Sequence, residues 1–547
     1  MPKIEGSEVS ASVYEKRFDE RLSLFLLPAL AVSLIATNRW FTLIDDEAFI
    51  IDRAAKPARQ TIQLFFSGVG EHQHPPLYDL ILHGWLHLTN GNMHLLRLPA
   101  IAFFVLGLWV LAMAAKFLGG SRSQACVLWI AALSPYGFHF GRVAVWYSFC
   151  FFLVSLVTLC YLNFLSKSTR ANWLWLALSS LCLVYSNYFG WALLGCLAFD
   201  YVVRNISRVA TWWLPFLATG ALLLIAYVPV FAAFVGELHR GPHADFHPVS
   251  VAANGVYNLY CLFVSESVAP WYWIAGVSAG LATGVCLILT LLGTSWPARR
   301  LLLYFFALFF IMMILGIIQP KRVMLISPWV ILPVGVVLGT LPKRFLRQTI
   351  FASLILVAAI GWLGILSRNL YAAPRWIEPW DKVSQQASDI IHNGGIVIGN
   401  NPSFFFYMTY SLPDDGAGAS HRFAGLLPTI RRTGIYDPTQ WLDAGRPVGT
   451  TTLLIKGLHF DIPSGPTEAA EGWLDQHCSL QESERLVHDP GAKWKQHFAP
   501  QIGQLEWRIE IRSYSCLLKK RAELTLIPSP SDLKSDLTFS RRFTELE

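Results

Sequence analysis

Charged residues are scarce in this 547-residue sequence, of which they make up 14%, against roughly 25% in an average soluble chain. Hydrophobic residues make up 54%, and the mean hydropathy is +0.43. The shortage of charge excludes an intrinsically disordered chain and a nucleic-acid-binding protein, and it argues against an ordinary soluble enzyme. We therefore expect an integral membrane protein. The net charge of +7 indicates no basic patch until the charges are placed along the chain.

A cleavable signal peptide is also missing. Residues 1–21 are polar and charged, the first apolar run begins at Leu22, and no small-residue cleavage site ends that run. We expect it to remain in the protein as an uncleaved helix.

Apolar stretches of about 17–25 residues can cross roughly 30 Å of hydrocarbon. The sequence contains about eleven of them, near residues 22–41, 97–117, 124–141, 144–165, 172–187, 188–203, 211–235, 270–294, 301–318, 323–341 and 349–366. The sequence therefore predicts a polytopic α-helical membrane protein with about 11 transmembrane helices.

Basic residues orient these helices, because cytoplasmic loops carry an excess of Lys and Arg. With the N-terminus in the cytoplasm, every short loop on that side carries at least two positive charges, as in Lys116/Arg122 and Arg299/Arg300. This consistency favours eleven spans over ten or twelve. It predicts a multi-pass protein of the inner (plasma) membrane whose C-terminus is extracytoplasmic.

Three segments on the predicted outer side are longer than turns, namely 42–96, 236–269 and 368–547. We divide the chain into a transmembrane domain over 1–367, in which 42–96 is a first extracytoplasmic loop with amphipathic helices, and an extracytoplasmic α/β domain over 368–547. In the latter, apolar spacing predicts a helix over 380–391 and strands at 396–398, 453–455 and within 505–518.

Two of the nine cysteines, Cys478 and Cys516, lie in the predicted outer domain. An oxidising compartment would allow them to pair. The sequence does not give their separation, so a disulfide and two free thiols both remain open.

Three consecutive carboxylates, Asp45, Asp46 and Glu47, directly follow the first membrane helix. Acidic residues suit a solvated loop or a helix N-terminus. The alternative is a general base, or an anchor for a cation, at the membrane surface.

The same loop continues with His72, His74 and two prolines, and ends with Arg97. A lone histidine is more often structural than catalytic, although either histidine could act as an acid, a base or a ligand. Basic residues on the outer side need a reason, and binding of a phosphate is one because guanidinium matches phosphate geometry. The candidates include Arg97, Arg142, Lys321 and Arg322.

The chain resembles the GT-C polytopic glycosyltransferases, in particular the group related to protein O-mannosyltransferases and the lipid A aminoarabinose transferase. The resemblance is carried by the order and spacing of several short motifs. They are Asp46-Glu47-Ala48, His74-Pro75-Pro76-Leu77-Tyr78, Leu96-Arg97-Leu98-Pro99, Leu133-Ser134-Pro135 with Tyr147, Tyr185-Ser186-Asn187-Tyr188-Phe189, Lys321-Arg322, and Trp380 followed by Gly395-Ile396-Val397-Ile398.

The resemblance implies a glycosyltransferase that uses a sugar on a polyprenyl phosphate at the outer face of the membrane. The acceptor would be lipid A or lipopolysaccharide, a polysaccharide, another lipid or a protein. It implies an inverting displacement with Asp46 as the base or acceptor-orienting residue, flanked by Asp45 and Glu47. It also implies phosphate binding by His74, Arg97, Lys321 and Arg322, and a substrate pocket with Tyr78, Tyr147, Asn187 and Tyr188. Arg142 is a further candidate for phosphate binding, which rests on its place in a short outer turn and not on the resemblance.

The sequence departs from the family pattern in two places. Where many members read Gln-Glu-Ala-Arg-Met-Tyr, this chain reads Arg142-Val143-Ala144-Val145-Trp146-Tyr147, and Asn187 replaces a family histidine. These losses put a metal site in doubt, so a divalent cation stays an open possibility and no cofactor is assigned.

Two other functions fit a polytopic chain. A secondary transporter needs charged residues at the bilayer midplane, whereas the predicted spans here are almost free of charge. A membrane-anchored assembly factor would act through its outer domain, but it would leave the acidic loop and the His-Pro-Pro motif without a purpose.

Overall fold

The structure of the protein is a computed structural model. It describes residues 25–67, 74–92, 95–240, 248–270, 272–293, 296–368, 370–372, 374–401, 435–449, 451–458, 464–489 and 507–516, with Phe404 and Met408. These residues form two compact units. The helical unit comprises Met1–Trp40, His74–Trp85 and Met93–Ala373, and the sheet unit comprises Phe41–Gln73, Leu86–Asn92 and Pro374–Glu547.

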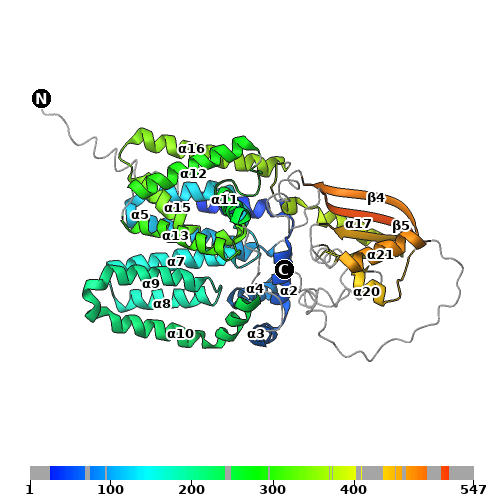
Figure 1. The fold of residues 1–547 in the computed structure, drawn as a ribbon, viewed down its shortest axis with the longest axis horizontal. Helices are drawn as coiled ribbons and strands as arrows, with labels where there is room; N and C mark the ends of the chain where they lie inside the picture. The colour runs from blue at the N-terminus through cyan, green and yellow to red at the C-terminus, as the bar shows by residue number, and fades with distance from the viewer. Residues whose placement is uncertain are drawn as a thin grey trace. The chain divides into compact units, whose positions relative to one another are not determined.

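The helical unit is a bundle of apolar helices (Figure 1). After a helix over Phe25–Ala36 and the short turn η1 (Asn38–Trp40), its main elements are α4 (Leu77–Leu88), α5 (Leu98–Leu133), α6 (Pro135–Phe140), α7 (Tyr147–Ser166), α8 (Arg170–Val184), α9 (Gly190–Asn205), α10 (Val209–Arg240), α11 (Pro248–Val264), α12 (Trp273–Gly293), α13 (Trp296–Ile314), α14 (Pro320–Val323), α15 (Pro328–Thr340) and α16 (Arg344–Ser367).

Five helices in the described ranges are long and apolar enough to cross a membrane: Leu98–Leu133, Tyr147–Ser166, Trp273–Leu291, Trp296–Ile314 and Arg344–Ser367. Shorter apolar helices occupy Phe25–Ala36, Leu217–Phe231, Val251–Val264 and Pro328–Thr340. The largely helical, membrane-type fold is as predicted, and the number eleven stays a prediction.

The predicted spans 97–117 and 124–141 meet in α5, which is broken at Gly120. This residue has φ +78° and ψ −173°, a conformation that glycine adopts without a steric penalty. Small residues also let α15 approach α5 closely, since a Cβ on Gly339 would lie 2.5 Å from the backbone nitrogen of Ser123. Such close helix contacts are typical of membrane bundles.

The sheet unit has a five-stranded sheet of order β2-β1-β3-β5-β4, formed by β1 (Ile396–Gly399), β2 (Ile435–Tyr436), β3 (Thr452–Gly457), β4 (Ser479–His488) and β5 (Trp507–Ser515). Strand β1 pairs in parallel with β2 and β3, whereas β5 pairs antiparallel with β3 and β4. The unit also contains α2 (Asp45–Ala55), α3 (Ala58–Ser67), the turn η4 (Pro374–Ile377), α17 (Trp380–His392), α20 (Pro438–Asp443) and α21 (Ser464–His477).

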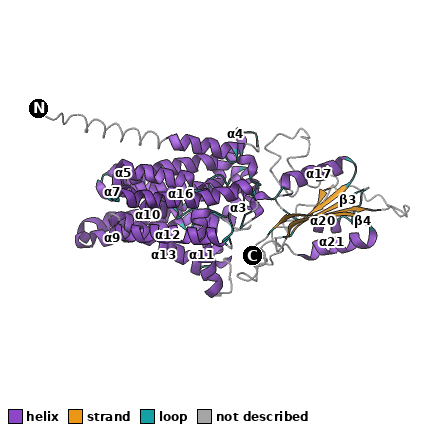
Figure 2. Ribbon diagram, turned by 90° about the horizontal axis from the view of Figure 1, so that it is seen from above, coloured by secondary structure: helices purple, strands orange, loops and turns teal. Residues whose placement is uncertain are grey.

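Helices cover both faces of the sheet, with α17 on one side and α20 and α21 on the other (Figure 2). Alternating side chains of each strand therefore enter two separate cores. Val397, Leu453 and Ile511 pack with α17, while Leu454 and Tyr514 pack with the helices opposite. The predicted helix at 380–391 and the predicted strands at 396–398, 453–455 and within 505–518 are confirmed.

Cys478 and Cys516 form a disulfide, which resolves the alternative that the sequence left open. It joins the residue after α21 to the residue after β5. The other seven cysteines lie in the helical unit and are free thiols.

Replacing both bonded cysteines by serine is expected to lower the free energy of unfolding of the sheet unit by about 3–4 kcal/mol, because the bond closes a loop of 38 residues whose entropy the unfolded chain then regains. This change is measured on the full chain in detergent, as the urea concentration at which half of the sheet unit becomes susceptible to a protease. Cys196→Ser, a change at a free thiol of α9, is the control. An unchanged midpoint in the double variant would contradict the expectation.

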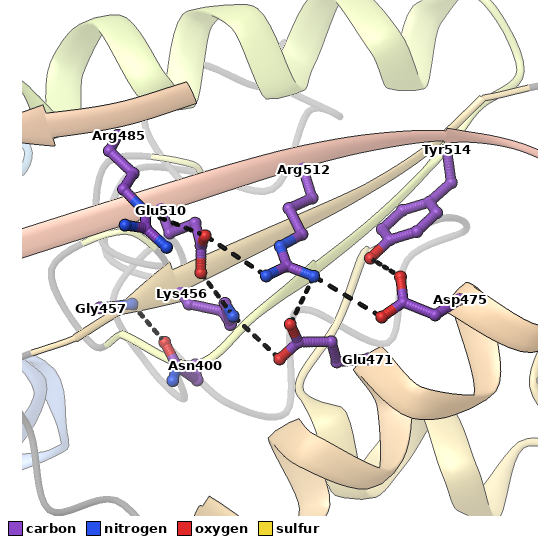
Figure 3. A network of polar contacts seen from close by, with 9 residues as sticks. All are labelled: Asn400, Lys456, Gly457, Glu471, Asp475, Arg485, Glu510, Arg512 and Tyr514. Atoms are coloured by element: carbon purple, nitrogen blue, oxygen red, sulfur yellow. Dashed lines mark hydrogen bonds and ion pairs between the residues drawn. The ribbon is translucent and has the colours of Figure 1, made fainter. Parts of the chain in front are cut away.

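A charged network lies between the sheet and α21 (Figure 3). Lys456 contacts Glu510 at 2.6 Å and Glu471 at 2.8 Å, and Arg512 contacts Glu471 at 2.5 Å. Burial alone would raise the pKa of Glu510, but the hydrogen bond and charge of Lys456, with the charge of Arg512, bring that pKa below its ordinary value.

Glu510 stabilises the sheet unit above the ordinary glutamate pKa of about 4.3, because its folded-state pKa is lowered; this stabilisation is lost as the pH falls through the lowered value. Glu510→Gln is expected to cost about 1–3 kcal/mol at neutral pH by leaving Lys456 with one partner fewer, and to flatten the acid side of the stability profile. Thermal unfolding between pH 7 and pH 3 measures both effects. Glu484→Gln, at an exposed position of β4, should reproduce the wild-type profile.

Candidate active site

The three acidic residues form the first turn of α2, in the sheet unit. Glu47 is fully buried, and its Oε2 accepts a hydrogen bond at 3.0 Å from the backbone N–H of Ile44. It therefore closes the start of the helix, as acids at helix N-termini do. Asp46 is partly exposed, so of these two carboxylates it is the more accessible to a substrate.

The start of α2 is fastened to the segment that precedes α17. The backbone N–H of Thr42 donates to Trp376 O at 3.2 Å, and the Thr42 hydroxyl donates to Glu378 O. Glu378 in turn accepts hydrogen bonds from the Trp380 indole at 2.7 Å and from Arg508 at 2.9 Å. These contacts hold the acidic turn against the segment that precedes α17.

In the helical unit, His74 and Tyr188 lie together although they are over a hundred residues apart. The His74 ring is 4.8 Å from Trp146 and 6.2 Å from Tyr188, and Trp146 packs on Tyr147 at 4.3 Å. Aromatic side chains bury large apolar areas and pack against one another at ring-centroid distances of this order. The structure thus brings His74, Tyr147 and Tyr188 into one aromatic cluster.

The other two predicted pocket residues, Tyr78 and Asn187, are buried and make contacts within the helical unit. Tyr78 is buried and packs on Phe149 at 6.0 Å. Asn187 is buried, and its Oδ1 accepts from the backbone N–H of Phe189 at 2.8 Å, which shapes the turn before α9.

Arg97 and Arg142 are both buried, and both donate hydrogen bonds to the residues that follow the helix Phe25–Ala36. Arg97 Nη1 donates to Asn38 O at 3.3 Å and to Asn38 Oδ1 at 3.2 Å. Arg142 donates to Thr37 O and to Phe138 O, each at 2.9 Å, and its guanidinium lies 4.1 Å from the Phe138 ring centroid. These contacts give both arginines a role in fixing the helix ends.

Lys321 and Arg322 lie in the short helix α14 and are partly buried. Arg322 Nη1 donates to Ile317 O at 3.2 Å, which leaves further donors of the guanidinium for an anion. The Tyr136 hydroxyl donates to Pro320 O at 2.6 Å and so ties α14 to α6.

An apolar cleft, partly open to the surroundings, has Met324, the residue directly after α14, in its wall. Its walls are Phe104, Leu108, Trp129, Ile130, Ala131, Leu133, Ser134, Tyr136, Gly137, Phe151, Leu262, Phe263, Met324, Ser327, Val330, Ile331, Val334, Phe351, Leu354, Ile355, Val357 and Ala358. Tyr136 and Met324 belong to the wall and also flank the basic pair. The cleft is thus an apolar space with cations close to its lining.

One buried polar cluster, formed by His139, Ser265 and Glu266, was not predicted from the sequence. His139 Nδ1 lies 2.6 Å from Ser265 Oγ, the His139 ring is 5.5 Å from that of Tyr371, and Glu266 is 3% exposed. Ser265 has φ +69°, a left-handed conformation that is strained for serine. A signal was present in the sequence, since between Arg97 and Arg368 the only acidic residues are Asp200, Glu237, Asp245 and Glu266.

No group of three or more His, Cys, Asp or Glu side chains with a metal-binding arrangement occurs among the described residues. His72 lies outside the described residues. The divalent cation therefore has no assigned ligands.

No protein-family model matches this chain, and no curated protein matches it. Solved structures do. The crystal structure of ArnT from Cupriavidus metallidurans in the apo state matches with a TM-score of 0.52 at 14% identity, and that of the same protein bound to undecaprenyl phosphate matches with a TM-score of 0.51 at 13% identity.

Each match covers 89% of this chain and 97% of ArnT. The arabinofuranosyltransferase AftD from Mycobacteria is matched over 92% of this chain and 40% of its own, at 14% identity and a TM-score of 0.37, which is too low to support a shared overall fold. The GT-C-like fold that the resemblance implies is confirmed: this chain has the fold of ArnT.

Proposed function

We propose that this chain is an inverting glycosyltransferase that moves a sugar from a polyprenyl-phosphate donor to an acceptor at the outer face of the inner membrane. The observation that carries the proposal is the apolar cleft beside the basic helix α14. A polyprenyl phosphate has a long apolar chain and one anionic group, so it needs this combination. The ArnT structure with bound undecaprenyl phosphate supports a donor of this class.

The prenyl chain would lie in the cleft, where each buried CH₂ contributes roughly 0.8 kcal/mol. Arg322, with Lys321 beside it, would hold the phosphate. As the bond from the anomeric carbon to the phosphate oxygen breaks, negative charge grows on the departing phosphate, and a fixed guanidinium stabilises that charge.

Asp46 would take the proton of an acceptor hydroxyl, or orient the acceptor when that group is itself a phosphate. The hydroxyl oxygen then forms the new bond to the anomeric carbon from the side opposite the phosphate, which inverts its configuration. Glu47 is engaged at the helix start, so we give it a positioning role, and Asp45 a secondary one. His74, Tyr147 and Tyr188 would form the wall for a sugar ring.

The disulfide supports an extracytoplasmic sheet unit, because such bonds persist in oxidising compartments. Labelling the full chain in intact cells with a membrane-impermeant maleimide, before and after reduction, tests this. The two bonded cysteines should react only after reduction and without permeabilisation. Reaction that requires permeabilisation would place the unit in the cytoplasm.

Incubation of the purified protein with labelled polyprenyl-phosphate sugars and candidate acceptors tests the reaction itself. Transfer of label to an acceptor, with release of free polyprenyl phosphate, is expected. Movement of a labelled solute across vesicles without any covalent transfer would instead support a transporter. Native mass spectrometry of co-purified lipid narrows the identity of the donor.

A further inference from the structure

A buried carboxylate, Asp200, lies at one end of the helical bundle and accepts four hydrogen bonds. They come from Tyr161 Oη at 2.5 Å, Arg204 Nε at 2.6 Å, Arg300 Nη1 at 2.5 Å and Tyr304 Oη at 3.1 Å. The donors belong to α7, α9 and α13. Asp200 is 1% exposed, and its ion pairs hold the guanidinium groups of Arg204 and Arg300 in place.

The positive charge of this cluster exceeds its negative charge. Arg204, Arg299 and Arg300 contribute three positive charges, and Asp200 contributes one negative charge. The other three acidic residues between Arg97 and Arg368 all lie in the segment 236–269, which the topology predicts on the opposite side of the membrane. Among the described residues between Arg97 and Arg368, Asp200 is thus the acidic residue on this side of the membrane, and it balances one of the three positive charges.

Arg299 adds a second observation. Its Nε atom is shielded from solvent and has no hydrogen-bond partner among the described residues. Its guanidinium lies 5.9 Å from the Trp296 ring, and that of Arg300 lies 4.6 Å from the same ring. A shielded, unsatisfied guanidinium donor is costly unless an anion accepts from it.

The position of Arg299 and Arg300 on α13 also favours the binding of an anion. Both lie near the N-terminal end of this 19-residue helix, where the helix dipole disfavours cations and favours anions. An anion held here would gain from the dipole and from the arginines together.

Exposed apolar side chains surround the cluster, which decides what kind of anion fits. Trp296 is 54% exposed, and Phe199, Val203 and Leu303 on α9 and α13 are 62%, 42% and 48% exposed. In a membrane protein such side chains face acyl chains, and tryptophan marks the headgroup level. A free ion would make no use of these surfaces, whereas a phospholipid would cover them.

We propose that Arg299, together with Arg204 and Arg300, binds the phosphate of an anionic phospholipid. Asp200 holds Arg204 and Arg300 in place, and Trp296 lies beside Arg299 and Arg300. The guanidinium groups hold the headgroup, and the acyl chains lie along α9 and α13. This site is independent of the proposed transfer reaction, since it uses none of the residues assigned to the donor or acceptor.

Native mass spectrometry of the delipidated full chain tests the proposal with phosphatidylglycerol and phosphatidylethanolamine of identical acyl chains. We expect one phosphatidylglycerol to be retained in preference to phosphatidylethanolamine. Arg299→Gln should weaken that retention about fivefold, and Arg299→Gln with Arg300→Gln about 25-fold, because each arginine near a membrane surface contributes on the order of a fivefold effect. Arg299→Gln leaves the bonds to Asp200 intact. If the double variant does not fold, the retention of phosphatidylglycerol by this single variant therefore tests the proposal.

Arg344→Gln is the matched control, since Arg344 is an exposed arginine at the start of α16; it should change retention less than about twofold. Equal retention of the two lipids, or an equal loss in the Arg344 variant, would overturn the site. Inorganic phosphate is the third arm. If it raises the melting temperature of the wild type as much as phosphatidylglycerol does, the cluster is a site for free anions and the lipid assignment is wrong.

Discussion

Asp46→Asn is expected to abolish sugar transfer, with a fall in turnover of about 10²–10⁴-fold, while the protein still folds and inserts. Removal of a general base costs an effect of this size, because asparagine cannot accept the acceptor proton. Asp46 is partly exposed and its neighbour Glu47 is committed to the helix start, so the substitution should leave α2 in place. Initial rates with a labelled polyprenyl-phosphate sugar measure the loss, and the thermal unfolding profile checks the fold.

Two variants of the same turn serve as controls. Asp45→Asn should reduce turnover less than Asp46→Asn does. Glu47→Gln should act mainly on stability, by roughly 1 kcal/mol, through the weakened helix start. Full activity in Asp46→Asn would remove the base role, and equal losses at Asp45 and Asp46 would mean that the two carboxylates act as a pair.

Arg322→Gln is expected to lower turnover about 10²–10³-fold, the usual cost of losing one donor to a developing negative charge. Arg322 is partly buried next to the apolar cleft, and Ile317 O holds one of its nitrogens. The loss should therefore fall mainly on kcat, where charge has accumulated on the departing phosphate, and less on the binding of free polyprenyl phosphate. Steady-state kinetics together with lipid-binding measurements separate these two effects.

Arg322→Lys should recover part of the rate, because it restores the charge but not the planar pair of donors. Arg344→Gln, a change at the start of α16, should leave the rate unchanged. Normal turnover in Arg322→Gln would show that the phosphate is held elsewhere, with Lys321 or His74 as the next residues to replace.

The sequence predicts much of the fold because hydrophobic runs report directly on membrane helices. It also predicts α17 from the apolar spacing before Gly394, a glycine with φ +76°, and β1 from the short apolar run after it. Strand β4 is different: most of Ser479–His488 is exposed, so no alternation of apolar residues marks it. It exists because β5 pairs with it, which is a contact that local sequence cannot reveal.

The candidate site likewise has a part that the sequence predicts and a part that it does not. The motif around His74 and Tyr188 could be predicted, and the structure brings these two residues to the same aromatic cluster. The use of Arg97 and Arg142 to hold Asn38 and Thr37 could not, because it depends on how distant helix ends meet. Asp200 was hidden for a related reason, since a single acid in an apolar run has meaning only once its partners are known.

The last strand in the described part of the chain, β5, occupies an interior place in the sheet, between β3 and β4. The ribosome therefore delivers the described membrane helices, and four of the five described strands, before the sheet can close. Until residues 507–516 emerge, β3 and β4 have no common neighbour and Cys478 has no Cys516 to pair with. A stop codon before Trp507 would thus release a chain whose helical bundle is complete but whose C-terminal sheet is left open, with unpaired strand edges exposed to aggregation and proteolysis.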